Sequence, residues 1–477
     1  MSLLWTAQEM IEAMDGRPVG NIPEGVTGIS IDSRTVGAGD AFFAIKGDKF
    51  DGHDFASAAI ANGAALLVVA ESKLPALGRL TAPMIVVNDV LAALEDLGRA
   101  ARARSEAKII AITGSVGKTS SKEMLRRALE PSGEVHASAA SFNNHWGVPL
   151  TLARMPVSAQ YGVFEVGMNH PDEIRPLVKM VRPHVAIITT IAAAHLGNFK
   201  NLTEIAAAKA EIMEGVVKNG HILLNRDNEK FSWLKKRASE LSSAKVLAFG
   251  EHAKADCRLL NCKLLPDCST ITARIGKDEV AVKIGAPGRH LVQNALAVLG
   301  AVQLAGADLA KASHALAAIS AEKGRGARHE LSIDGGSFIL IDESYNANPA
   351  SMRAALELLR DTPVRLRGRR IAVLGDMLEM GKFADRVHRE LAEPIRQAHA
   401  DMVCLAGSEM KALRDELGTD VETVYRETAD DLADHLKNVL RDGDVVMVKS
   451  SLGIGFGRIV KALLDKYQAL SDSSAND

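Results

Sequence analysis

The segment AKIIAITGSVGKTSSKEML, residues 107–125, decides how the rest of this sequence is interpreted. Its first part, Lys108–Thr113, is a short apolar run rich in isoleucine, which predicts a buried strand. A turn of small residues follows, and Ser121–Leu129 then carries apolar residues at helical spacing. A strand, a glycine loop, a lysine, a hydroxyl residue and a helix make the layout of a phosphate-binding loop, because backbone N–H groups and the helix N-terminus face the anion.

The loop between this strand and this helix contains the groups that a nucleotide phosphate needs. Lys118 would neutralise the anion, and Thr119 could bind Mg²⁺. The full motif G-x-x-x-x-G-K-[ST] would place its first glycine where this chain has Ile112. The alternative is a glycine-rich turn with an incidental lysine, but the flanking strand and helix favour a phosphate site. The residues predicted to bind the nucleotide are Gly114, Ser115, Gly117, Lys118, Thr119 and Ser120.

Length, composition and charge indicate an ordinary globular protein. The 477 residues predict roughly two to four domains. Charged residues make up 24% of the chain and the formal net charge is −2, which excludes the basic footprint of a nucleic-acid-binding protein. No apolar run is long enough to span a bilayer. The four cysteines form no C-x-x-C pair, so we expect reduced thiols, no zinc site and a cytoplasmic location.

The order of apolar runs and helical patterns predicts an α/β protein with three domains. Residues 1–105 form a small unit, whose turns at residues 32–34 and 51–55 suit either a diphosphate ligand or ordinary turn chemistry. Residues 106–325 alternate strand and helix, which is typical of a mostly parallel sheet. Residues 326–477 form a third unit, again βαβ in character. We therefore expect a cleft between domains, where binding sites are common.

Two polar residues lie near predicted strand ends in the central unit. Glu165 is near the end of the strand Tyr161–Val166, and His195 lies in the loop after the strand Val185–Ile191. Ligands of open parallel sheets bind at the carboxyl ends of the strands, so these residues and the phosphate loop could converge. Taken alone, His195 would be interpreted as a loop histidine with no role.

A lysine lies on the apolar face of a predicted helix, Thr203–Val217. Ile205, Ile212 and Met213 share one face of that helix, and Lys209 falls on the same stripe. A lysine that faces inward needs a partner or a modification. The alternative is a lysine at the edge of the stripe, whose ammonium reaches water along its own apolar stem.

Further motifs, taken together with the phosphate loop, resemble the Mur ligases, the ATP-dependent ligases that form amide bonds in bacterial cell-wall precursors. The resemblance covers nearly the whole chain, and the family's own phosphate loop is a shortened one, so Ile112 is no objection. The runs Tyr345–Pro349 and Gly375–Glu379 favour the member that uses a D-alanyl-D-alanine dipeptide. The motifs that carry the resemblance are residues 32–34, 51–55, 114–119, 143–144, 165–167, 194–196, 208–211, 342–349 and 375–381.

The resemblance implies roles for the residues at matching positions. The residues implied to hold two Mg²⁺ ions are Thr119, Glu165, His195 and Lys209, and those implied to be catalytic are Lys118, His195 and Lys209, with Lys209 carrying a CO₂-derived carbamate. The residues implied to complete the ATP site are Asn294, Arg325 (or Arg328), Asp342, Tyr345 and Asn346. The residues implied to bind substrate are Ser33, Arg34, Gly47 and His53 at the UDP end, and Asn143 and Asn144 at the acceptor site.

The implied reaction adds D-alanyl-D-alanine to UDP-N-acetylmuramoyl-tripeptide and converts ATP to ADP and phosphate. A carboxylate forms an amide at neutral pH only after activation, and an acyl phosphate supplies the activated group. The implied domains are a UDP-sugar domain (1–105), a central ATP-binding domain (106–325) and a Rossmann-like C-terminal domain (326–477). The expected partners are the two substrates, with no nucleic acid and no membrane span, and we expect a monomer.

The chain departs from the family pattern in two places. His145-Trp146 stands where many relatives have an acidic and then an aliphatic residue, and residues 449–452 read Lys-Ser-Ser-Leu instead of Lys-Gly-Ser-Arg. The cation that the C-terminal domain brings to the γ-phosphate is therefore left open. The alternatives are folylpolyglutamate synthase or another Mur ligase, a P-loop switch or kinase, and a relative that only binds. The signature at residues 32–34, the additional substrate domains and the intact catalytic set argue against them.

Overall fold

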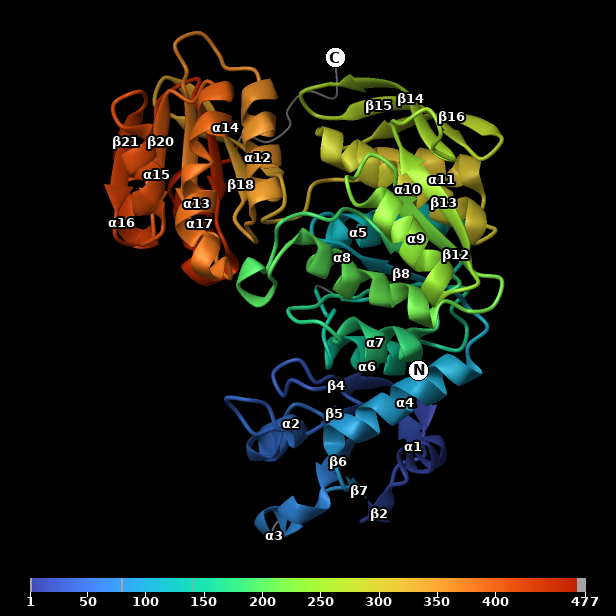
Figure 1. The fold of residues 1–477 in the computed structure, drawn as a ribbon. Coiled ribbons are helices and arrows are strands. Elements are labelled where there is room, and N and C mark those ends of the chain that lie inside the picture. Colours follow the sequence, from blue (N-terminus) through green and yellow to red (C-terminus); the bar gives the residue numbers. More distant parts are fainter. Residues whose placement is uncertain (1, 79, 140, 470–477) are drawn as a thin grey trace, which may run out of the picture.

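The structure is a computed structural model that describes residues 2–78, 80–139 and 141–469. Three α/β units follow one another along the chain, each built on its own sheet (Figure 1). The predicted α/β class with three domains is confirmed, whereas the boundaries after residues 105 and 325 stay predictions. Within the described part of the chain, no helix has the length and apolar character that a membrane crossing requires.

The N-terminal unit, blue in Figure 1, has a small sheet in which only β2 runs antiparallel to its neighbour. Its strands, in spatial order, are β2 (Arg17–Val19), β7 (Met84–Val87), β6 (Leu66–Ala70), β5 (Asp40–Phe43) and β4 (Gly28–Ser30), and β1 (Trp5–Thr6) pairs separately with β3 (Gly25–Val26). The helices are α1 (Ala7–Met14), α2 (Ala56–Ala61), α3 (Leu74–Leu77) and α4 (Val90–Arg104). A capping box of Thr6 and Glu9 starts α1 and satisfies its first N–H groups.

Buried hydrogen bonds join the N-terminal unit to the central unit. The long helix α4 packs against α6 (Gly147–Ala153), and the Trp5 indole N–H donates to the Ala153 carbonyl at 2.8 Å. The Arg154 guanidinium donates to the Ile29 carbonyl at 2.7 Å. The buried Arg102 guanidinium donates to the Val181 carbonyl at 2.8 Å. Removing either partner of a buried bond of this kind leaves a polar group unsatisfied, so these contacts stabilise the packing of the two units.

The central sheet has a parallel part, from β9 to β13, and an antiparallel extension, β14 to β16. Its strands, in spatial order, are β16 (Asp278–Ile284), β15 (Ser269–Ile275), β14 (Cys257–Leu264), β13 (Lys245–Gly250), β12 (His221–Asn225), β11 (Val185–Ile188), β8 (Lys108–Thr113), β10 (Tyr161–Glu165) and β9 (Val135–Ala137). Its further helices are α5 (Lys118–Leu129), α7 (Ile174–Val181), α8 (Leu202–Ala210), α9 (Phe231–Leu241), α10 (Arg289–Leu304) and α11 (Leu309–Ala315).

Strand β8 is covered by helices on both faces, which explains its uniformly apolar sequence. Ile110 and Ile112 pack with Leu125 of α5 and with α10 on one face. Ile109 and Ala111 point the other way and pack with α6, α7, α8 and α9. The strand therefore sits in the middle of the sheet, and the phosphate loop that follows it opens at the carboxyl edge.

The C-terminal unit, orange to red in Figure 1, has a six-stranded sheet that is parallel except for its edge strand β17. Its strands, in spatial order, are β17 (Ala327–Ile333), β18 (Gly336–Glu343), β22 (Val445–Lys449), β19 (Arg370–Gly375), β20 (Met402–Ala406) and β21 (Glu422–Arg426). The helices are α12 (Pro349–Asp361), α13 (Ala384–Arg389), α14 (Ala392–Gln397), α15 (Met410–Leu417), α16 (Ala429–Val439) and α17 (Gly457–Lys466).

Two helices differ from the sequence prediction. Helix α5 starts at Lys118 rather than at Ser121, because Gly117 adopts a left-handed conformation and turns the chain directly into the helix. The predicted helix Thr203–Val217 is wrong over its last seven residues, 211–217. Regular α8 ends at Ala210 and a 3₁₀ turn follows, where a Cβ on Gly215 would lie 2.3 Å from the Val178 carbonyl oxygen. Close packing on α7 thus sets the end of the helix.

Candidate functional site

A cavity of about 230 Å³ lies between the central and C-terminal units, at the carboxyl edge of the central sheet. Strands β8, β10 and β11 end there, as predicted for an open parallel sheet. Residues from both units line it. The predicted site residues in its lining are Ser115, Gly117, Lys118, Thr119, Ser120, Asn143, Glu165, His195, Arg325, Tyr345 and Asn346.

The phosphate loop is fixed by close contacts that exclude side chains at its two glycines. A Cβ on Gly114 would lie 1.9 Å from the Thr189 hydroxyl oxygen, and a Cβ on Gly117 would lie 2.7 Å from the Asn294 amide oxygen. The Thr189 hydroxyl donates to the Val116 carbonyl at 2.6 Å. The loop is therefore a rigid cradle, and the buried Asn294 lies against it.

The cation of the loop is Lys118, whose ammonium donates to the Gly114 carbonyl at 2.9 Å. Its charge thus lies over the loop, in reach of an anion held by the N–H groups. Burial lowers the pKa of the Lys118 ammonium, and the Glu165 carboxylate nearby acts in the opposite direction. A bound phosphate would raise this pKa again, because an anion favours the charged form of the amine.

Glu165 ends strand β10 and places a buried carboxylate in the cavity wall. Its Oε1 accepts a hydrogen bond of 2.7 Å from the Asn143 amide. Its Oε2 is buried and has no hydrogen-bond partner among the described residues. A buried carboxylate oxygen without a partner is costly unless a cation binds it, so this atom suits a metal ion.

Lys209 is the inward lysine that the helix pattern predicts, with only 1% of its surface exposed. Because the side chain is buried, the alternative of a lysine at the edge of the apolar stripe is wrong. No hydrogen bond or ion pair of its ammonium is found among the described residues. Burial, together with the positive charge of Lys118, holds the pKa of the Lys209 amine well below its usual range. The amines of Lys118 and Lys209 repel each other when both are charged, so an anion bound between them would be stabilised.

His195 lies in the loop after β11, in a left-handed conformation with φ of 55°. Its Nδ1 contacts the carboxylate of Glu379 in the C-terminal unit. The hydrogen bond from His195 lowers the pKa of Glu379. The imidazole also lines the cavity. It therefore contacts the C-terminal unit and the site at the same time.

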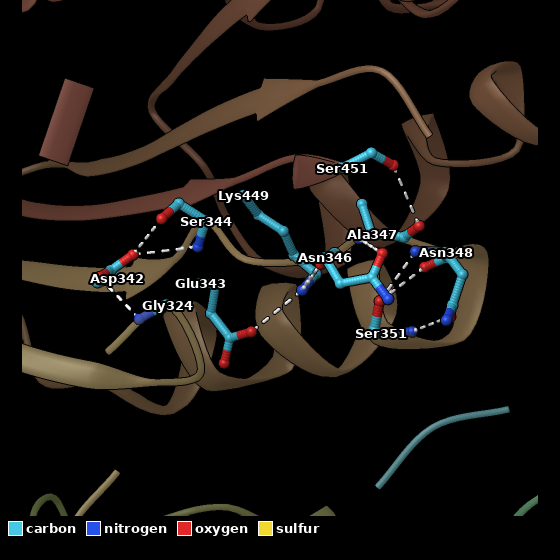
Figure 2. A network of polar contacts seen from close by, with 10 residues as sticks. All are labelled: Gly324, Asp342, Glu343, Ser344, Asn346, Ala347, Asn348, Ser351, Lys449 and Ser451. Carbon is cyan, nitrogen blue, oxygen red and sulfur yellow. Dashed lines mark hydrogen bonds and ion pairs between the residues drawn. The ribbon is translucent and has the colours of Figure 1, made fainter. Parts of the chain in front are cut away.

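A network of the C-terminal unit borders the cavity and involves the predicted residues Asp342 and Asn346 (Figure 2). Both carboxylate oxygens of Asp342 are used: one accepts from the Gly324 N–H at 2.8 Å and the other from the Ser344 hydroxyl at 2.6 Å. Asp342 therefore fixes the segment that links the two units. The Lys449 ammonium donates to Glu343 Oε2 at 3.0 Å and to the Asn346 carbonyl at 2.9 Å.

The structure separates the two candidate arginines of the linker. The Arg325 guanidinium lies over the Tyr345 ring, 4.4 Å from its centroid, and both residues line the cavity. The Tyr345 hydroxyl reaches across to the Ser141 hydroxyl of the central unit at 3.2 Å. Arg328 instead donates to the Pro266 carbonyl and is absent from the cavity lining. Of the two, Arg325 is the one placed to meet a ligand.

The predicted residues of the N-terminal unit lie outside this cavity. The side chain of His53 is buried, with Nδ1 bonded to Asp51 at 2.6 Å and Nε2 accepting from the Ala70 N–H at 2.9 Å. Exposed Arg34 pairs with Asp32 at 2.7 Å. The substrate-binding role of His53 and Arg34 stays a prediction. The same holds for Ser33, whose side chain is buried.

One contact connects the N-terminal unit with the predicted acceptor segment. A Cβ on Gly47 would lie 2.8 Å from the ring of Trp146. The Asn144 amide oxygen accepts from the N–H groups of Trp146 and Gly147, at 3.2 and 2.9 Å, and thereby shapes the start of α6. The unusual Trp146 thus holds the Gly47 loop against the segment that contains Asn143.

Sequence analysis missed three functional candidates. Glu379 was named only within a motif, and no residue pattern indicates that it contacts His195, which is 184 positions away. The buried pair of Lys449 and Glu343 joins two strand ends. Both residues lie within runs that resemble the family, 342–349 and 449–452, and at the ends of β18 and β22, but neither signal indicates that they pair.

Family models match each of the three units. The model described as "Mur ligase family, catalytic domain" matches residues 25–102, "Mur ligase middle domain" matches residues 112–302, and "Mur ligase, glutamate ligase domain" matches residues 324–452. The middle match contains the phosphate loop, Glu165, His195 and Lys209.

Relatives match over almost the whole chain. A Rickettsia prowazekii protein named UDP-N-acetylmuramoyl-tripeptide--D-alanyl-D-alanine ligase is 34% identical over 92% of this chain and 95% of its own length. An Escherichia coli protein of the same name is 34% identical over 91% of this chain and 93% of its own length. A crystal structure of MurF from Acinetobacter baumannii, 30% identical, has a TM-score of 0.83 and covers 97% of this chain and 99% of that chain. The chain therefore belongs to the Mur ligase family.

Proposed function

We propose that this protein is the ATP-dependent ligase that adds D-alanyl-D-alanine to UDP-N-acetylmuramoyl-tripeptide in peptidoglycan synthesis. The relatives that match 91 to 92% of the chain carry this name. One arrangement in the site supports this proposal most strongly. The phosphate loop and Glu165, whose buried Oε2 has no partner among the described residues, line one cavity, and the positive charge of Lys118 acts on the buried Lys209; this arrangement suits two anions and the metal ions between them.

The residues at the cleft fit Mg²⁺ ions. Glu165 offers a buried oxygen, Thr119 a hydroxyl beside the phosphate loop, and His195 a ring nitrogen. No cluster of three His, Cys, Asp or Glu residues is found in the described ranges, so phosphate oxygens would supply the other ligands. When bound, Mg²⁺ would offset the charge that builds up on the transferred phosphoryl group.

Lys209 is suited to carry a carbamate. A carbamate forms when a neutral amine attacks CO₂: an N–C bond forms and a proton leaves. Burial and the charge of Lys118 lower the pKa of Lys209, which favours the neutral form in which the amine is reactive. The product is an anion close to Lys118, which replaces an unfavourable contact between two amines by a favourable one. That anion would be the fourth protein group around the metal ions.

The other predicted residues have positions compatible with their proposed roles. Asn294 lies beside Gly117, and its buried amide nitrogen has no hydrogen-bond partner in the part of the chain that the structure describes, which suits a nucleotide. Asn143 donates to Glu165 and lines the cavity, which is compatible with a place in the acceptor site. The cavity is completed within one chain, which supports a monomer. ATP as a substrate supports a cytoplasmic location.

The proposed reaction has two steps, and both require that negative charge is stabilised and that water is excluded. The terminal carboxylate of the tripeptide attacks the γ-phosphorus, the bond to ADP breaks and an acyl phosphate forms. The amine of the dipeptide then attacks the acyl carbon, phosphate leaves and the amine loses a proton. Lys118 of the phosphate loop and Arg325 of the linker line the cavity in which the negative charge develops. The C-terminal unit also keeps water from the acyl phosphate.

The test of this function is the dependence of ADP release on both substrates. We expect ADP release with mass-spectrometric formation of the pentapeptide product only when ATP, UDP-N-acetylmuramoyl-tripeptide and D-alanyl-D-alanine are present together. Glutamate in place of the dipeptide is the matched control, and it should give no product. Product with glutamate and none with the dipeptide would contradict the proposed acceptor.

A further inference from the structure

The loop that holds His195 and the loop that holds Glu379 dock against each other, backbone to backbone. The Gly197 N–H donates to the Glu379 carbonyl at 2.7 Å. A Cβ on Gly381 would lie 2.7 Å from the Gly197 Cα, so a side chain has no room there. Both His195 and Glu379 adopt left-handed conformations, with φ of 55° and 63°. Two strained residues held by a close backbone contact indicate a specific docking point between the central and C-terminal units.

The side-chain contact is too exposed to matter much for stability. The side chain of His195 is 26% exposed and that of Glu379 is 50% exposed. Pairs of this kind contribute roughly 0 to 1 kcal/mol to folding. The contact does determine which ring nitrogen remains available to a ligand. Glu379 contacts Nδ1, while the ring lines the cavity. A carboxylate bonded to Nδ1 places the proton of a neutral imidazole there and leaves the Nε2 lone pair for a metal ion.

We propose that Glu379 is a positioning residue for His195, which orients the imidazole and selects the tautomer that binds metal through Nε2. This inference rests on the proposed function, since it assumes a metal ion at His195. Because Glu379 belongs to the C-terminal unit, His195 is a competent ligand only while that unit is docked. Metal binding and domain docking are thereby coupled, and ATP is not activated before the third domain is in place.

The test compares Glu379→Gln with wild type by two readouts that need no turnover. The first is the tautomer of His195 in ¹⁵N-histidine-labelled protein, assigned with a His195→Asn variant. The second is Mn²⁺ affinity, measured by electron paramagnetic resonance with a non-hydrolysable ATP analogue. A glutamine can either accept from or donate to Nδ1, so it no longer selects a tautomer. We expect a mixed tautomer and Mn²⁺ affinity about 10-fold weaker.

Two further variants sharpen the result. Glu379→Asp keeps the carboxylate and should recover part of the Mn²⁺ affinity. Glu390→Gln is the matched control: its carboxylate is 48% exposed and pairs with Arg353, away from the cavity, so nothing should change. Wild-type affinity and tautomer in Glu379→Gln would overturn the role of Glu379 alone. A wild-type protein with no Mn²⁺ site would overturn the proposed metal site, and this inference with it.

Discussion

Replacing Lys209 with alanine should lower the ligation rate by about 10³-fold while the protein stays folded. The lysine is 1% exposed, and no partner for its ammonium is found in the described part of the chain. If it carries a carbamate, the variant loses an anion that faces the metal ions. Steady-state rates and thermal unfolding of Lys209→Ala measure the two effects separately. Short carboxylates such as formate or acetate should restore part of the rate, because they can occupy the vacated volume and supply the missing charge.

The matched control is Lys200→Ala, which removes a lysine that is 87% exposed near the start of the same helix. It should leave the rate unchanged, with or without added carboxylate. A carbon-13 signal from labelled bicarbonate, present in wild type and lost in Lys209→Ala, would identify the carbamate directly. Full activity of Lys209→Ala would refute the role of this lysine.

The second large effect is expected for Glu165→Gln, which keeps the shape of the side chain and removes its charge. The Asn143 amide can still donate to the glutamine oxygen, so the wall of the cavity is preserved. The oxygen that has no partner among the described residues is lost as a metal ligand. We expect the ligation rate to fall by about 10²-fold to 10³-fold. The free energy of unfolding should not fall, because a buried charge is removed.

Activity at increasing Mg²⁺ and denaturant unfolding without Mg²⁺ measure these two quantities. Glu106→Gln, at an exposed position before β8, is the control and should behave like wild type in both. A Glu165→Gln variant that is strongly destabilised would indicate a structural role for the carboxylate. Unchanged Mg²⁺ dependence would contradict its role as a metal ligand.

The phosphate loop could be predicted from sequence because its signal is local. An apolar run, two glycines, a lysine and a helix pattern lie within twenty positions, and β8 has the predicted bounds of Lys108–Thr113. Helical periodicity places Lys209 on the apolar stripe but leaves open a lysine at its edge; the family resemblance favours the inward position, and the side chain is buried. Its helix nevertheless ends early, because the packing of Gly215 on Val178 is a tertiary contact that periodicity does not contain.

The contacts between domains could not be predicted for the same reason. Glu379 and His195 are 184 positions apart, and Lys449 and Glu343 are 106 apart. Neither pair has a spacing that a local pattern could reveal. A local motif can also hide a contact that is distant in sequence. His53 lies in the motif 51–55, yet its two ring nitrogens bind Asp51 and the Ala70 N–H. Only a fold that brings β6 beside this turn explains that arrangement.

The central claim is that ligation passes through an acyl phosphate in this cleft. The most direct test starts from UDP-N-acetylmuramoyl-tripeptide labelled with ¹⁸O in its terminal carboxylate. We expect the released phosphate to contain one ¹⁸O atom, because a carboxylate oxygen becomes the bridge to phosphorus and leaves with it. Phosphate free of ¹⁸O, formed together with the pentapeptide product, would rule out the acyl phosphate.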